Sequence, residues 1–417
     1  MNKKRLLCAV VVLLCAGAAF SQDYGLTLRS LPVFTNGDDP SVNVGYTGTV
    51  IPWFAAPLGE RGDLYLSGGI SAEYADEEWK PVPELYRFEI LYRFGSGLRL
   101  EAGRLPYREP LNMVMNGLFD GLAAGQDLGK TRLSVRALYT GLLYKKTAWI
   151  TMNSGDYAEY QDRDRYFASR RLVFSLDWEI PGLFDTEGRL DLGLTGQFDL
   201  NEPEDQPEDQ TDKPDQTGQV DGNGKIHSQY ALAKFTLPFL NSFNAELGTL
   251  LGLLEEDGRE PGFCFAFSGA LAWLPSGGLN DRLSLNMAVS SGAWDDTVRA
   301  FLPINTIAQG KVLRPKISGL ALTELVYTAR LHNSLSTDIE AAYFFRTDSR
   351  TYSDPELDGD SLSPLLGGEV HAGLTWAPVS DVSFTLGGGA FFPQWGKAFV
   401  PDTPARWRVS LETILSF

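Results

Sequence analysis

The last twelve residues of the chain alternate in polarity without a break and end on Phe417. The odd positions from Trp407 are Trp, Val, Leu, Thr, Leu and Phe, and the even positions from Arg406 are Arg, Arg, Ser, Glu, Ile and Ser. A period of two gives a strand with one apolar and one polar face. About ten residues of tilted strand cross a bilayer, but a lone strand would leave its edge N–H and C=O groups unsatisfied in lipid. This segment therefore predicts a closed barrel.

The same strand resembles the carboxy-terminal assembly signal of bacterial outer-membrane barrels, which usually ends in an aromatic residue. That resemblance implies a place in the bacterial outer membrane and contact with its lipid. It also implies that the barrel-assembly machinery recognises the strand that ends in Phe417.

Residues 1–21 have the pattern of a cleaved secretory signal, with Lys3, Lys4 and Arg5 before an apolar core at residues 6–14 and small residues after it. Cleavage after Ala18 or after Ser21 fits the pattern, and we favour Ser21. The remaining residues, 22–417, are expected to form one barrel domain. The alternative is an uncleaved membrane anchor, but the apolar core is short for a spanning helix. No later segment offers about 18 consecutive apolar residues, so no transmembrane helix is predicted.

Charge and cysteine content exclude several classes of protein. Removal of residues 1–21 leaves 33 Lys and Arg against 53 Asp and Glu, a net charge of −20, so nucleic acid is not an expected partner. Only Cys264 remains in the mature chain, which excludes an intramolecular disulfide.

Alternating segments recur along the whole mature chain, and short and long connections alternate between them. We predict an all-β, transmembrane, antiparallel up-and-down barrel of about 18 strands (16–18), with short periplasmic turns and long extracellular loops. The expected strands are 24–33, 41–55, 63–74, 84–94, 98–104, 119–128, 131–144, 168–181, 188–200, 226–239, 243–255, 262–274, 282–293, 316–330, 334–347, 365–376, 381–392 and 406–417.

Four tryptophans each precede a proline near a short turn, which suggests an aromatic girdle at the periplasmic interface. They are Trp53, Trp178, Trp273 and Trp376. The alternative is that they are ordinary core residues that happen to precede turns.

A barrel of this size encloses more volume than its wall side chains fill. With the apolar face of each strand placed toward lipid, the inward positions of the first half are rich in arginine and those of the second half are mostly acidic. The predicted pore-lining residues are Arg87, Arg93, Arg99, Glu101, Arg132, Arg136, Arg171, Glu324, Glu340, Arg408 and Glu412. Opposed basic and acidic walls would favour polar solutes. The alternative is that these charges pair across adjacent strands and only stabilise the wall.

One local stretch joins Gly103-Arg104 at the end of one strand to Phe119-Asp120-Gly121 at the start of the next. It resembles a segment of outer-membrane porins of the alginate-export and carbohydrate-selective kinds, over about 20 residues. Those porins have 18 or 16 strands and take polyanionic or sugar substrates.

Little in the chain suggests catalysis. Its three histidines are His227, His332 and His371, and a hydrolase on the wall would need one of them beside a nucleophile. His371, with Glu369 two residues away, is the nearest candidate. We expect no enzyme activity, no metal site and no cofactor.

The sequence thus predicts a passive, porin-like channel for small hydrophilic solutes in the bacterial outer membrane. It is compatible with a homo-oligomer. The alternative is a structural or adhesive surface protein whose barrel displays its extracellular loops.

Overall fold

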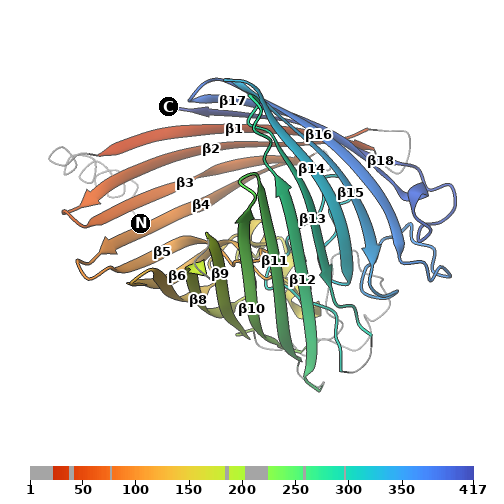
Figure 1. The fold of residues 1–417 in the computed structure, drawn as a ribbon, viewed down its shortest axis with the longest axis horizontal. Coiled ribbons are helices and arrows are strands. Elements are labelled where there is room, and N and C mark those ends of the chain that lie inside the picture. Colours follow the sequence, from red (N-terminus) through yellow and green to blue (C-terminus); the bar gives the residue numbers. More distant parts are fainter. Residues whose placement is uncertain are drawn as a thin grey trace.

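The computed structural model describes residues 22–36, 42–75, 78–183, 187–201, 224–256, 260–294 and 297–417. The predicted signal, residues 1–21, lies outside the described residues. Figure 1 shows strands wrapped around an interior that also holds irregular segments.

All eighteen strands belong to one sheet in which each strand pairs with its sequence neighbours and β1 also pairs with β18, so the sheet closes. Every pairing is antiparallel, and the predicted 18-stranded up-and-down barrel is confirmed. The strands are β1 (Asp23–Asn36), β2 (Val42–Leu58), β3 (Gly62–Ala75), β4 (Glu78–Arg93), β5 (Leu98–Arg108), β6 (Asn116–Leu128), β7 (Thr131–Tyr139), β8 (Arg171–Leu183), β9 (Gly188–Asp199), β10 (Ile226–Phe239), β11 (Phe243–Glu256), β12 (Gly262–Trp273), β13 (Arg282–Ser290), β14 (Leu320–His332), β15 (Leu335–Arg346), β16 (Leu365–Val379), β17 (Val382–Phe392) and β18 (Arg406–Ser416).

Short turns and long connections lie at opposite rims of the barrel. In Figure 1 the turns after β2 and β4 lie at the left and the turn after β10 lies near the centre, whereas the connections after β13, β15 and β17 lie toward the right and lower right. This division matches the predicted periplasmic and extracellular rims.

Several predicted strands have wrong boundaries at the long-connection rim. β4 starts at Glu78 instead of residue 84, and β5 continues to Arg108 instead of ending at residue 104. Three other predicted strands are shorter than expected, because the chain leaves the sheet at this rim. The strand expected over 131–144 ends at Tyr139, and the next residues lead to the short helices α2 (Lys145–Ala148) and α3 (Ser154–Gln161). The strand expected over 282–293 ends at Ser290, and the one expected from 316 starts at Leu320. None of the helices in the described part of the chain is long and apolar enough to cross a membrane.

The outer face of the barrel carries large exposed apolar side chains at alternate positions, as on β11, where Leu247 is 65% and Leu251 64% exposed. Trp178, Trp273 and Trp376 also lie on this face, near the short-turn rim, as the girdle requires. The prediction is wrong for Trp53. Trp53 lies opposite Ser67 on β3, and Ser67 lies opposite Arg87 on β4. Residues opposite each other point to the same face of a sheet, so Trp53 faces the lumen with Arg87.

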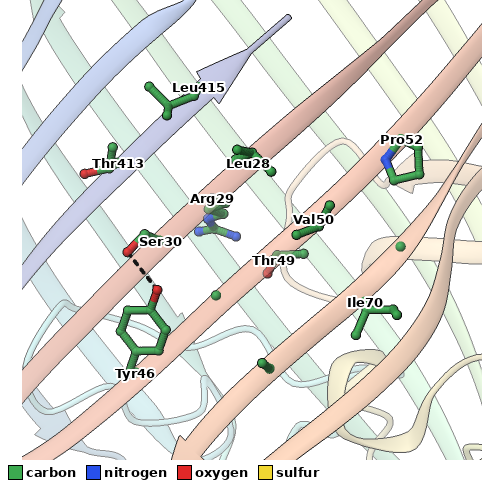
Figure 2. A pocket seen from close by; sticks show the side chains of 13 residues that line it. Leu28, Arg29, Ser30, Tyr46, Thr49, Val50, Pro52, Ile70, Thr413 and Leu415 are labelled. Carbon is green, nitrogen blue, oxygen red and sulfur yellow. Dashed lines mark hydrogen bonds between the residues drawn. The ribbon is translucent and has the colours of Figure 1, made fainter.

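A shallow apolar groove of about 810 Å³ crosses the outer face over β18, β1, β2 and β3 (Figure 2). Leu28, Val50, Ile70 and Leu415 line it, and all four occupy lipid-facing positions of their strands. The groove therefore belongs to the lipid-facing surface and not to the interior.

Arg104 closes a gap in the wall. Pairing between β4 and β5 stops at Phe88 opposite Arg104, although both strands continue. Arg104 makes two 2.9 Å hydrogen bonds to the Asp120 carboxylate and also donates to the carbonyls of Leu85 (2.6 Å) and Leu142 (2.9 Å). Buried carbonyls need such donors. Arg104 and Asp120, which carry the porin-like motif, therefore act within the wall.

Arg104→Ala should lower the free energy of unfolding by about 3–5 kcal/mol, because Asp120 is left without its partner in a largely buried place. The measurement is urea unfolding of protein folded into lipid vesicles. Arg108→Ala, at an exposed position on the same strand, is the matched control and should change little. Equal effects of the two variants would contradict the role given to Arg104.

Candidate functional site: the barrel interior

Two of the long connections enter the barrel and fill part of its lumen. They are residues 109–115, between β5 and β6, and residues 297–319, between β13 and β14. Their side chains Met115, Phe301, Ile304 and Ile317 are fully buried. They belong to one apolar cluster with lumen-facing residues of the wall, which include Leu138, Val173, Tyr230, Leu250, Cys264 and Phe344.

The two inserted segments are joined by hydrogen bonds. The Ile304 N–H donates to the Val114 carbonyl (2.8 Å), and the Asn305 side chain both accepts from the Asn116 N–H (2.9 Å) and donates to its carbonyl (2.7 Å). Residue Thr151 joins them, since its N–H donates to the Ile304 carbonyl (3.0 Å). The segments therefore form one connected body inside the barrel.

Two buried carboxylates hold the backbone of these segments. Glu109 is 1% exposed and accepts from the N–H groups of Leu111, Met113 and Val114. Burial raises the pKa of the Glu109 carboxyl, and these donors oppose the shift.

Glu369, on the β16 wall, is likewise 1% exposed and accepts from the N–H groups of Lys311 and Leu313. Charged acceptors of this kind make strong hydrogen bonds. We conclude that Glu369 attaches residues 309–316 to the barrel wall.

The arginines predicted on the first-half wall lie on the lumen face but have acidic partners nearby. Arg87 pairs with Glu89, Arg93 with Asp63, and Arg136 with Asp177. Arg99 and Arg132 share Asp127, at 3.2 and 2.8 Å. Sequence reasoning missed Asp63 and Asp127 as partners, although each lies close to a short turn with an arginine on the neighbouring strand.

Arg171 differs from the others because its side chain has no solvent exposure. It forms ion pairs with Asp199, on β9, and with Asp156, in helix α3, whose side chain also caps that helix. In this structure Arg171 attaches α3 to the wall and has no surface that a solute can reach.

The acidic residues predicted on the second half have individual partners as well. Glu324 accepts from Asn286 (2.9 Å), and Glu340 lies 3.7 Å from the Lys311 ammonium. Glu412 pairs with Arg29 on β1, a lumen residue that the sequence analysis did not single out. Glu101 and Arg408 have no ion pair among the described residues.

The histidines do not form a catalytic arrangement within the described ranges. His371 Nδ1 lies 3.6 Å from Asp338, and no hydrogen bond joins its ring to a serine, threonine or cysteine. His332 contacts Ser334, but both lie in an exposed turn. The described residues also contain no group of three or more His, Cys, Asp or Glu side chains placed to hold a metal ion.

Comparison with known proteins gives a fold and no sequence relative: no family model and no curated protein matches the chain. The solved structure of OccK2 (OpdF) from Pseudomonas aeruginosa is 14% identical with a TM-score of 0.60, covering 95% of this chain and 98% of that one. OpdK from the same organism is 12% identical (TM-score 0.59, 95% and 99%), and its outer membrane protein OprD is 11% identical (0.56, 95% and 94%). OccK2 has also been solved in complex with glucuronate. The chain therefore has the fold of these outer-membrane barrels over nearly its whole length.

Glu369→Ala should release residues 309–316 from the wall, because two backbone N–H groups lose their acceptor. We expect trypsin to cleave after Lys311 at least about tenfold faster than in the unaltered protein. A decrease of about 1.4 kcal/mol in the free energy of releasing the segment raises the released fraction tenfold. The measurement is limited proteolysis of the folded barrel followed by mass spectrometry. Glu246→Ala, which removes a carboxylate near the other rim, is the control and should leave the rate unchanged. Unchanged cleavage in Glu369→Ala would show that this carboxylate does not hold the segment.

Proposed function

We propose that the protein is a porin-like channel in the bacterial outer membrane through which small hydrophilic solutes diffuse passively. The observation that carries this proposal is the distribution of exposed charge on the lumen face. The side chains of Arg29, Arg87, Arg93, Arg99 and Arg132 each keep 39–51% of their surface exposed. They lie on β1, β4, β5 and β7, away from the apolar cluster of the inserted segments.

The inserted segments favour the channel function over the alternative, in which the barrel only displays its extracellular loops. Residues 109–115 and 297–319 come from the long-connection rim, yet they pack inside the barrel. A displayed loop gains nothing from such packing, whereas a channel is narrowed by it. The solute path then runs between the inserted body and the charged strip of β1–β7 and β18.

The exposed charges of this strip alternate in sign and nearly cancel. A solute that passes meets guanidinium donors and carboxylate acceptors at close intervals, which can replace its hydration. Weak, repeated contacts of this kind let a polar solute enter and leave. We propose that the exposed residues among the predicted pore-lining set act in this way, and that the channel has no catalytic activity and needs no cofactor.

The fold likeness is consistent with this function, and so is the glucuronate held by OccK2, a small polar solute. Export by residues 1–21 with cleavage after Ser21, and recognition of the strand ending in Phe417 by the assembly machinery, are parts of the same proposal. Amino-terminal sequencing of the mature protein tests the cleavage site.

Ion selectivity in planar bilayers tests the charged strip. Arg99→Gln with Arg132→Gln leaves Asp127 unpaired at the lumen surface, so the reversal potential in a salt gradient should shift toward cation preference. Asp127→Asn leaves two unpaired arginines and should shift it toward anions.

A reconstituted protein that forms no conductance would overturn the channel itself. If the unaltered protein, the double arginine variant and Asp127→Asn all conduct with the same reversal potential, the role of these residues in ion selectivity would instead be overturned.

A further inference from the structure

Three neighbouring strands place two aromatic rings and a guanidinium side by side on the lumen face near the short-turn rim. They are Trp53 on β2, Tyr65 on β3 and Arg87 on β4. The rings of Trp53 and Tyr65 are nearly parallel, with an angle of 13° and 6.4 Å between their centroids. The Arg87 Cζ lies 4.8 Å from the centroid of the Tyr65 ring. Parallel, offset rings at this spacing form a stepped, flat surface.

The Trp53 ring is supported from one side by β1. A Cβ placed on Gly25 would come within 2.6 Å of two carbons of that ring, so the glycine makes room for it. Trp53, Tyr65 and Arg87 are all only partly buried. Large aromatic surface left accessible in a water-filled lumen is costly, because about 25 cal/mol is lost per Å² of apolar area kept in water. Such a surface suits a ligand with a flat apolar face.

The charge beside the rings is balanced. Arg87 Nε donates to Glu89 (2.7 Å), and the two side chains form an ion pair. A guanidinium that already has a carboxylate partner is a poor site for a free anion. It still offers donors, and the carboxylate still offers acceptors, to a neutral polar group.

A row of hydroxyl groups continues along the same three strands toward the other rim. Thr49 and Ser71 hydroxyls lie 3.0 Å apart, and Ser71 lies 3.0 Å from the Tyr86 hydroxyl. Each hydroxyl can donate and accept. The wall formed by β2–β4 is therefore aromatic near the short turns and carries hydroxyl groups beyond them, with the Arg29–Glu412 ion pair beside Thr49 on the neighbouring strands.

We propose that Trp53, Tyr65 and the Arg87–Glu89 pair form a subsite that binds the ring of a neutral pyranose sugar. The C–H face of the sugar stacks on the two rings, and its hydroxyls bind the guanidinium and the carboxylate. The hydroxyls of Ser71 and Tyr86, which are only partly buried, receive the sugar on its way through. This inference rests on the proposed function, because it assigns a solute class to the same channel.

The test is block of ion current by D-glucose in planar bilayers that hold single channels. Glucose should block the unaltered channel, and Trp53→Ala and Tyr65→Ala should each weaken the block about tenfold, the effect of about 1.4 kcal/mol of lost stacking. Trp53→Phe should restore most of it. Phe54, the next residue on β2, lies on the lipid face, so glucose should block the Phe54→Ala channel as strongly as the unaltered channel.

Glycerol, which has hydroxyls but no ring, serves as the second probe and should reduce current equally in all variants. Absence of conductance would overturn the channel, and with it this subsite. A conducting channel with no glucose block, or with the same block in Trp53→Ala and Tyr65→Ala as in the unaltered protein, would overturn the subsite alone.

Discussion

The structure depends on one constraint: the backbone N–H and C=O groups of a strand in lipid must all be paired. The last strand satisfies it by pairing with the first, and Leu26 and Phe417 exchange backbone hydrogen bonds of 3.0 and 2.9 Å where the sheet closes. Once the sheet is closed, every strand has an outer and an inner face. The lipid-facing surface and the lumen both follow from that closure.

Where strand pairing stops, buried side chains take over the same task. Arg104 donates to a β4 carbonyl beyond the last β4–β5 pair, and Glu369 accepts from the backbone of a segment that has no strand partner. These groups let connections leave the sheet and enter the lumen without orphaned backbone groups. The result is an asymmetric interior, with an apolar body on one side and exposed, paired charges on the other.

The fold was predictable from the sequence because a period of two recurs in nearly every strand, and both the count of eighteen and the two rims are confirmed. The interior was less predictable. We assumed that the apolar face of each strand meets lipid, but β11 has leucine on both faces: Leu251 lies outside, and Leu250 packs against the inserted segments. The run Leu250–Leu254 was the signal that a second apolar body lies inside. Trp53 was misplaced for a related reason, since a tryptophan near a turn can face either side of the wall.

The central claim is that the lumen is open along β1–β4 and β18 and at the short-turn ends of β5–β7 and β17. Packed segments close it along β8–β16 and at the long-connection ends of β5–β7 and β17. Single cysteines test it most directly, in a Cys264→Ala background, with a water-soluble, membrane-impermeant maleimide as the label. Ser383→Cys and Ser410→Cys lie on the lumen face of the open side and should be labelled rapidly. Ser175→Cys and Ser228→Cys, at positions 5% and 1% exposed, should resist labelling. Equal labelling at all four positions would contradict the asymmetric lumen.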